Sequence, residues 1–313
     1  MPDVLLAVDL GGTKFAAGLV TPRGELLGRG RVPVDREGSS QPLFDSLSGL
    51  IEEQLELAAD LGVRVRAVGV GCAGPIERNC ETVSPVNIGA WRQFPLRSKL
   101  AELTGLAVYG DLDAKALALS EGWLGAATGV SNFCAMTVST GVGGGIVVDG
   151  QLLDGSSGNA GHIGHIIVEP GGHRCGCGAR GCLEAEASGL AIESITGRPP
   201  TEPTYEVMQR TGRLVGRAAA MVSAALDLEL VVIGGSVAFG FAATFFNSAN
   251  EELDRHPSLS GARRPRITAA RLGDQGPLIG AAAVGIRGIR RRQAGAASTG
   301  TATTPAGPAS PTA

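Results

Sequence analysis

The chain has 313 residues, with 27 lysines and arginines against 30 aspartates and glutamates, which gives a formal net charge of −3. At about 150 residues per domain, this length predicts two domains. The chain has no long basic run of the kind that binds nucleic acid, and no apolar stretch reaches the roughly 18 residues of a membrane span. These features exclude nucleic acid and membrane as expected partners and predict a soluble globular protein.

The N-terminus and the cysteines predict a cytoplasmic protein. Asp3 and Asp9 interrupt the apolar start, and neither a basic segment nor a small-residue cleavage site accompanies it, so we expect no secretory signal. The six cysteines fit a reducing compartment as free thiols or metal ligands. Glycine accounts for 48 residues, roughly twice the average usage, which predicts many tight loops near backbone or ligand.

Apolar runs and helical spacing alternate along the chain, which predicts alternating strands and helices. Apolar runs at residues 4–8 and 15–20 flank a glycine turn and indicate a β-hairpin. The other predicted elements are helix 43–61, strand 65–70, helix 94–103, strand 106–109, helix 113–124, strands 133–138 and 145–148, helix 204–226, strand 230–233 and helix 277–292.

Residues 293–313 are almost entirely Ala, Gly, Ser, Thr and Pro, a composition with little to bury, so we expect this tail to be disordered. Units of a strand followed by a glycine turn recur at Asp9, Ser139 and Gly234. Such recurrence is typical of two related α/β halves.

The hairpin turn at residues 9–14 is the first segment whose residues could bind a phosphate. Its glycines let backbone amides approach an anion, its threonine can donate to phosphate, and Asp9 can hold Mg²⁺ through water. On its own the segment is equally consistent with an ordinary turn. Two further loops with hydroxyls and glycines, at 139–145 and 233–236, also follow strands. Three such loops favour a nucleotide cleft, and their spacing matches neither a Walker loop nor a Rossmann fingerprint.

Three cysteines crowd into eight residues: Cys175, Cys177 and Cys182. Three histidines lie just upstream: His162, His165 and His173. Thiolates with one imidazole form a tetrahedral Zn²⁺ site, and a closed Cys₃His set makes the metal structural. Buried inert thiols are the alternative, but the interspersed glycines supply the tight turns of a metal knuckle.

Asp111 and Asp113 lie at the end of a predicted strand and the start of a predicted helix. A carboxylate in this position can act as a general base. The alternative is that Asp113 caps the helix and Asp111 is solvated.

These motifs, in this order and spacing, resemble the ROK family (repressor, open reading frame, kinase) over about residues 4–292. They are Asp9-Leu-Gly-Gly-Thr-Lys14, Thr140-Gly-Val-Gly-Gly-Gly145, Gly161-His-Ile-Gly-His165, residues 175–184 and Ile233-Gly-Gly235. The resemblance implies an actin-like ATPase (ribonuclease H-like) fold, in which two α/β domains flank a cleft. We expect residues 1–112 with 278–292 to form the smaller domain, and 113–277 the larger domain with the zinc loop.

The resemblance also implies roles for individual residues. The catalytic base is Asp113, and His173 is a bystander. The sugar-binding residues are Asn87, Asp113, His162, His165 and Glu184. The ATP- and phosphate-binding residues are Asp9, Gly11, Gly12, Thr13, Lys14, Thr140, Gly141, Gly234 and Gly235. The structural zinc ligands are His165, Cys175, Cys177 and Cys182, and Mg²⁺ accompanies ATP.

Three residues depart from the family pattern. His162 replaces a glutamate that accepts sugar hydroxyls, and a histidine here also resembles some N-acylmannosamine kinases of the family. Leu112 replaces an asparagine and loses its hydrogen bond to the sugar. Lys115 is either a surface residue or pairs with Asp111 or Asp113, and pairing with Asp113 would lower the pKa of that base and weaken it.

For the enzymes of the family, the resemblance implies ATP-dependent phosphorylation of a sugar hydroxyl, and we expect a glucokinase acting on the 6-hydroxyl. The alternative is an N-acylmannosamine or N-acetylhexosamine kinase. An alternative of another class is a non-catalytic sugar-binding regulator or a degenerate kinase, although the eight residues before Asp9 leave no room for the helix-turn-helix of the family's repressors. The expected partners are ATP, or polyphosphate as another donor, a hexose or N-acyl hexosamine, and a second copy of the chain in a homodimer or higher oligomer.

Overall fold

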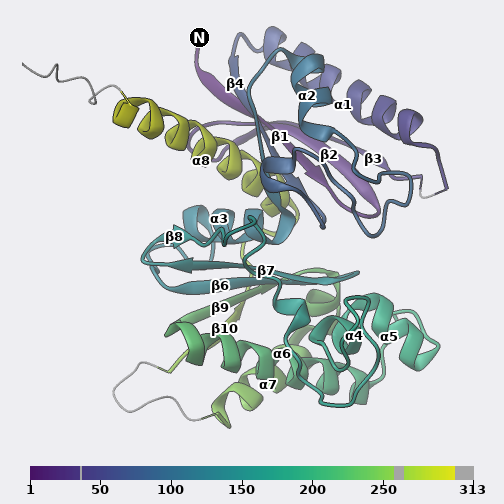
Figure 1. The fold of residues 1–313 in the computed structure, drawn as a ribbon. Coiled ribbons are helices and arrows are strands. Elements are labelled where there is room, and N and C mark those ends of the chain that lie inside the picture. Colours follow the sequence, from purple (N-terminus) through teal and green to yellow (C-terminus); the bar gives the residue numbers. More distant parts are fainter. Residues whose placement is uncertain (36, 257–263, 300–313) are drawn as a thin grey trace, which may run out of the picture.

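The computed structural model describes residues 1–35, 37–256 and 264–299, and contains two five-stranded sheets (Figure 1). The first sheet has the order β3-β2-β1-β4-β5. Its strands are β1 (Asp3–Leu10), β2 (Lys14–Val20), β3 (Leu26–Pro33), β4 (Arg64–Cys72) and β5 (Val108–Leu112). The second sheet has the order β10-β9-β6-β7-β8. Its strands are β6 (Phe133–Val138), β7 (Val142–Val148), β8 (Gln151–Leu152), β9 (Leu230–Gly234) and β10 (Arg266–Ala269).

The two sheets repeat one topology. In the first sheet, β1 pairs antiparallel with β2 and parallel with β4, which pairs parallel with β5. In the second, β6 pairs antiparallel with β7 and parallel with β9, which pairs parallel with β10. The prediction of two related α/β halves is therefore confirmed. The domain boundaries expected at residues 112 and 278 stay a prediction.

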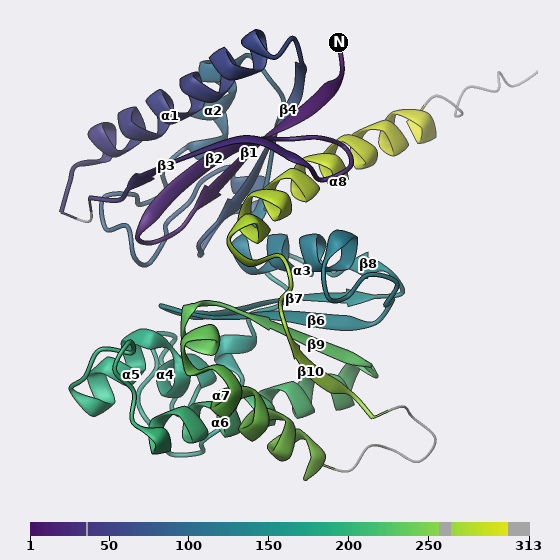
Figure 2. The ribbon, with the colours of Figure 1, turned by 180° about the vertical axis from the view of Figure 1, so that it is seen from behind.

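Helices form three layers around the two sheets. Helices α1 (Ser40–Asp60) and α2 (Leu96–Thr104) lie on the outer side of the first sheet, and α6 (Tyr205–Leu226) and α7 (Ser236–Asp254) pair on the outer side of the second (Figures 1 and 2). Helices α3 (Asp113–Leu124) and α8 (Gly276–Thr299) pack together between the sheets. The short helices are α4 (Leu183–Ala187) and α5 (Gly189–Thr196), with 3₁₀ turns η1 (Arg78–Cys80), η2 (Ile163–His165) and η3 (Gly273–Gln275).

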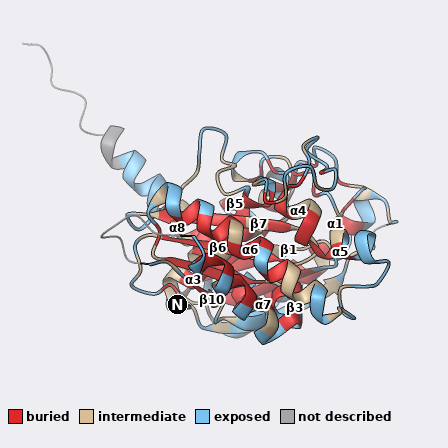
Figure 3. Cartoon of the chain, turned by 90° about the horizontal axis from the view of Figure 1, so that it is seen from below, coloured by how far each residue is buried: buried red, intermediate tan, exposed pale blue. Residues whose placement is uncertain are grey.

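The middle of β1, Val4–Val8, is apolar without a break, and helices cover both faces of the strand. Leu6 and Val8 belong to the same buried cluster as Leu47 of α1, whereas Leu5 and Ala7 belong to the cluster of α8. Alternate side chains of a strand point to opposite faces of the sheet, so a strand buried on both faces reads as one continuous apolar run. Figure 3 shows the resulting buried layers, which run through both sheets.

Several elements differ from the sequence prediction. Helix α8 continues to Thr299, so disorder from residue 293 is wrong for residues 293–299, and residues 300–313 lie outside the described part of the chain. Strands β3, β8 and β10 and helix α7 were not predicted. Strand β3 lacks an apolar stripe because two of its helix-facing residues are glycines. A Cβ at Gly28 would lie 2.2 Å from Leu57 Cδ2, and one at Gly30 would lie 2.5 Å from Leu50 Cδ1.

Glu121, near the end of α3, is fully buried and joins the two segments that connect the halves, α3 and the segment that leads into α8. Its carboxylate accepts hydrogen bonds from the backbone N–H of Ala126 at 2.7 Å and of Arg271 and Leu272 at 3.0–3.2 Å. The end of α3 and the segment leading into α8 are thereby held together at one carboxylate.

Among the described residues, no helix has both the length and the apolar composition needed to cross a bilayer.

Candidate active site

Asp9 and Asp113 lie at one edge of the first sheet, where its parallel strands end. Asp9 pairs in register with Gly71 of β4, and Gly71 pairs with Asp111 of β5. A Cβ at Gly71 would lie 3.9 Å from Asp9 Oδ1 and 3.8 Å from Asp113 Cα. Gly71 therefore lies between the Asp9 carboxylate and the backbone at the start of α3.

Burial changes the protonation of both carboxylates. Desolvation, helped by the negative charge of Asp113 and opposed by Lys14, raises the pKa of Asp9 from 3.8 to about 7. Desolvation also raises the pKa of Asp113 to about 6, against a hydrogen bond that its Oδ1 accepts from the Ala114 N–H at 2.7 Å. A base whose pKa lies near neutral pH is well suited to proton transfer.

Lys115 is fully buried and pairs with Asp111, which decides among the alternatives left open by the sequence. Its Nζ lies 3.3 Å from Asp111 Oδ1 and donates to the Gly158 carbonyl at 2.6 Å. Arg287 Nη1 lies 3.3 Å from the other oxygen of Asp111. Asp111 is thus occupied by two cations, and Asp113 is left as the carboxylate available for a general base.

The phosphate turn at residues 9–14 meets the segment that carries Asn87. The Gly11 N–H donates to the Lys14 carbonyl at 3.2 Å and closes the turn between β1 and β2. A Cβ at Gly12 would lie 2.6 Å from Asn87 Cβ, so the asparagine side chain packs directly on this glycine. Residues assigned to phosphate and to sugar are therefore neighbours here.

The other two glycine loops also lie together. Ser139 Oγ and Ser236 Oγ are 2.8 Å apart, which joins the β6–β7 loop that holds Thr140 to the start of α7. Gly235 has φ +107°, and a Cβ there would lie 2.3 Å from the Val138 carbonyl. The preceding residue, Gly234, ends β9. The close approach at Gly235 requires glycine and brings the β6–β7 loop beside the N-terminus of α7, and helix N-termini favour anion binding.

Glu184, His162 and His165 lie beside the β6–β7 loop. Glu184 Oε2 accepts a hydrogen bond from the Val142 N–H at 3.2 Å, and a Cβ at Gly141 would lie 3.1 Å from the same oxygen. The rings of His162 and His165 are 5.8 Å apart and tilted by 41°. Partial burial and the neighbouring His165 lower the pKa of His162 from 6.5, against the attraction of Glu184. Both effects favour the neutral form of the His162 imidazole.

Two glycines of β7 bring these groups toward the base. A Cβ at Gly143 would lie 3.0 Å from Ala114 Cβ, and one at Gly145 would lie 2.8 Å from Lys115 Cα. The strand thus packs against the first turn of α3, which begins with Asp113. Every residue expected at the site lies in one of these neighbouring groups, and their roles in binding and catalysis stay predictions.

A cavity of about 330 Å³ beside Asp9 and Lys14 is lined in part by residues that the sequence did not predict to lie at the site. Arg29 and Arg31 of β3 line it, and Arg29 pairs with Asp274 at 2.7 Å. The cavity offers cations near the expected phosphate turn. Their signal was hidden because β3 itself was not predicted.

Four side chains form a group that could hold a metal ion: His165, Cys175, Cys177 and Cys182. One ligand atom from each lies within 4.8 Å of all the others. Cys177 Sγ and Cys182 Sγ are 3.6 Å apart, as are Cys175 Sγ and His165 Nδ1. With Zn–S bonds near 2.3 Å, a tetrahedral site has ligand separations of about 3.8 Å, so these residues fit a zinc ion.

Hydrogen bonds shape the loop around this group. The Cys175 N–H donates to the Ala179 carbonyl at 2.8 Å, and the Gly178 N–H donates to the Cys175 carbonyl at 3.0 Å. His173 lies outside the group, as expected, and its Nδ1 lies 3.0 Å from Glu186 Oε2. Because Cys182 directly precedes α4, which carries Glu184, a metal here would also hold in place the carboxylate that is expected at the sugar site.

Comparison with known proteins gives concordant matches. The sequence model of the ROK family matches residues 5–287. The N-acetylmannosamine kinase of Haemophilus influenzae is 35% identical over 293 residues, covering 88% of this chain and 93% of that protein.

Two solved structures cover nearly the whole chain. The ROK hexokinase from Thermus thermophilus has a TM-score of 0.76 and 33% identity, covering 92% of this chain and 99% of that one. The ROK family glucokinase from Streptomyces griseus, in complex with glucose and AMPPNP, has a TM-score of 0.75 and 29% identity. The match covers 89% of this chain and 98% of that one. These matches confirm the expected actin-like α/β fold, and with the family model spanning most of the sequence, this chain belongs to the ROK family.

Proposed function

We propose that this ROK protein is an ATP-dependent sugar kinase whose substrate is an N-acylated hexosamine, N-acetylmannosamine. The observation that carries the choice of sugar is His162, beside Glu184, where the family resemblance leads us to expect a glutamate. The N-acetylmannosamine kinases among the relatives support this alternative over glucokinase, which was the first expectation from the sequence.

His162 suits an N-acyl group for a simple chemical reason. A carboxylate can only accept hydrogen bonds, whereas a neutral imidazole donates from one nitrogen and accepts at the other. The lowered pKa of His162 favours this neutral form. We therefore assign His162 to the acetamido group, whose carbonyl needs a donor, and Asn87 and Glu184 to sugar hydroxyls.

Asp113 is the base in the proposed reaction. Its carboxylate accepts the proton of the attacking sugar hydroxyl as the sugar oxygen bonds to the γ-phosphorus of ATP. The bond between that phosphorus and the bridging oxygen breaks, and ADP leaves with the electron pair. Phosphoryl transfer depends mainly on positioning and charge stabilisation, and a pKa near 6 lets Asp113 hold and release the proton close to neutral pH.

The remaining groups serve ATP. Gly11 closes the turn, the backbone amides of Gly12 and Gly141 and the hydroxyls of Thr13 and Thr140 donate to the phosphates, and Gly234 and Gly235 leave room for adenosine. Mg²⁺ near Asp9 would supply positive charge for the phosphates, and the repulsion between Asp9 and Asp113 favours a cation there. The zinc would be structural and would hold the loop of His165 and Glu184.

A panel of sugars tests the function directly. With Mg-ATP, we expect kcat/KM for N-acetylmannosamine to exceed that for glucose by about 10-fold or more, the effect of one well-placed hydrogen bond. ADP release is measured with N-acetylmannosamine, N-acetylglucosamine, mannose and glucose. A preference for glucose would refute the proposed substrate. Silence on every sugar, with sugar-induced thermal stabilisation, would identify a non-catalytic sugar-binding protein.

Replacing His162 by glutamate is expected to change the sugar preference. The carboxylate cannot donate to the acetamido carbonyl, so KM for N-acetylmannosamine should rise by about 10-fold, while activity with glucose should increase. His162→Gln retains a donor and an acceptor and is the matched control, with a smaller expected loss. An unchanged ratio of kcat/KM values in His162→Glu would remove His162 from substrate selection.

A further inference from the structure

The loop at residues 155–158 precedes the sugar-site segment and is held by two cations from outside it. Arg78 Nη2 donates to the carbonyls of Gly155 at 3.3 Å and Ser156 at 3.1 Å. Lys115 Nζ donates to the carbonyl of Gly158 at 2.6 Å. Arg78 begins η1, after β4 of the first sheet, and Lys115 lies in α3, whereas the loop follows β8 of the second sheet. Arg78 therefore holds the loop from the other half of the molecule, and Lys115 holds it from the helix that lies between the two sheets.

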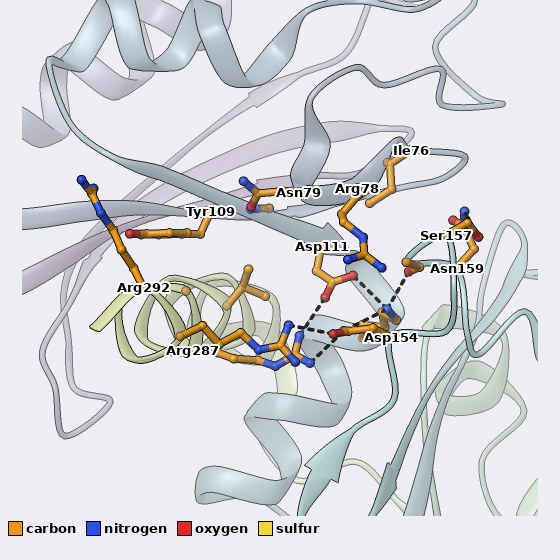
Figure 4. Close-up of a pocket in the computed structure, with 16 residues that line it drawn as sticks. Ile76, Arg78, Asn79, Tyr109, Asp111, Asp154, Ser157, Asn159, Arg287 and Arg292 are labelled. Carbon is orange, nitrogen blue, oxygen red and sulfur yellow. Dashed lines mark hydrogen bonds and ion pairs between the residues drawn. The ribbon is translucent and has the colours of Figure 1, made fainter. Parts of the chain in front are cut away.

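The Lys115 ammonium is itself fixed by carboxylates. It lies 3.3 Å from Asp111 and 3.8 Å from Asp154, and the Lys115 side chain is 1% exposed. Arg287 joins the same two aspartates, at 3.3 Å and 2.8 Å, and Figure 4 shows these three side chains pointing toward one another. Buried ion pairs add little net stability compared with apolar residues of similar volume. Stability alone therefore does not account for a charged group here.

The space beside the loop is hollow rather than packed. A cavity of about 420 Å³ is bordered by Arg78, Asp111, Lys115 and Asp154, and by Ser157 and Gly158 of the loop (Figure 4). On this side the loop faces the cavity, and Arg78 and Lys115 are the side chains whose hydrogen bonds hold it there. Gly158 has φ +89°, and a Cβ there would lie 3.7 Å from Arg78 Cα, so the backbone rests on Arg78 itself.

A short segment of chain joins this loop to His162. Three residues separate Gly158 from His162, and the last of them, Gly161, packs against β7. Gly161 has φ +104°, and a Cβ there would lie 2.2 Å from the Gly144 carbonyl. His162 thus follows a short segment that is held by Lys115 at Gly158 and by β7 at Gly161, and releasing Gly158 removes one of these two supports.

We propose that Arg78 and Lys115 are positioning residues that clamp the 155–158 loop and thereby set the affinity for the sugar through His162. This inference rests on the sugar site of the proposed function. Asn87 and Arg78 belong to the segment after β4, and His162 belongs to the other half, so the clamp also aligns the two sides of the sugar site.

Kinetics and binding test the clamp with two independent variants. Lys115→Met keeps the length of the side chain and removes its charge, and Arg78→Ala alters an exposed residue whose loss does not threaten folding. We expect each to raise KM for the sugar, and the sugar Kd in calorimetry without ATP, by about 10-fold, with kcat and KM for ATP changed less than about threefold. Arg78→Lys should restore part of the affinity. Arg64→Ala, at the opposite end of β4, is the matched control and should keep wild-type constants.

A general structural role predicts a different result, in which stability, kcat and both KM values change together. That pattern, or a wild-type sugar KM in Arg78→Ala, would overturn the clamp even if Lys115→Met fails to fold. If the wild-type protein phosphorylates glucose instead, the proposed substrate fails. The same selective rise in KM for glucose would then still support the clamp.

Discussion

Replacing Asp113 by asparagine is expected to lower kcat by about 10²- to 10⁴-fold, the usual contribution of a general base, while the sugar still binds. Asparagine has the same shape as aspartate, and its Oδ1 can still accept the hydrogen bond that Asp113 accepts from the Ala114 N–H at 2.7 Å. The start of α3 should therefore stay intact. Its amide cannot take the hydroxyl proton. Coupled ADP release measures the rate, and calorimetry with the sugar measures binding.

The pH dependence provides a second readout of the same prediction. The pKa of Asp113 is raised to about 6 and that of Asp9 to about 7, so the carboxylates become protonated as the pH falls through this range. The wild-type kcat/KM should therefore fall below about pH 7 rather than near pH 4, with apparent pKa values that belong to the interacting pair. Asp149→Asn changes an exposed turn residue and should keep the wild-type rate and profile. A near-normal kcat in Asp113→Asn would remove it from the role of base.

Zinc removal is expected to have the second large effect. The purified protein should contain about one zinc per chain, and Cys182→Ser, at a fully buried position, should lose it. Structural zinc contributes several kcal/mol to folding, so the melting temperature should fall by about 10 °C or more. Activity should fall as well, because the metal loop carries His165 and leads into Glu184.

Elemental analysis and a thermal melt check this prediction together. Cys134→Ser is the matched control, because Cys134 is a buried thiol outside the metal group and should keep a full complement of zinc. A purified wild-type protein that is fully folded and free of metal would contradict the site.

The sequence predicted those parts of the fold whose burial leaves a periodic pattern. Strand β1 was evident because both of its faces are apolar, and α6 because Leu214, Val215 and Ala218 recur at helical spacing. Strand β3 was missed because glycines stand where core side chains would give the signal. Helix α7 was missed because it combines Ala, Ser and Phe without a clean stripe and is interrupted at Ala242, where φ is +48°.

The site residues were likewise predictable only where their partners are close in the sequence. The metal group was predictable because its ligands fall within 18 residues of sequence, His165 to Cys182. The partners of Lys115 were less accessible. Asp111 is only four residues before Lys115, but Gly158 is 43 residues away in the sequence. Folding alone brings Gly158 to Lys115, so no local pattern could reveal this contact. The position of Gly71 likewise follows from strand order, since nothing in its own segment marks it as the neighbour of both Asp9 and Asp113.

The buried carboxylate of Glu121 has a mechanical consequence. The chain passes between the halves twice, through α3 and through the segment into α8, and Glu121 ties these passages at one end. The Lys115 and Arg287 ion pairs tie the same two helices further along. The two connections between the halves are therefore crosslinked at two levels, by Glu121 and by Asp111 with its two cations, and behave as one braced unit rather than as independent linkers.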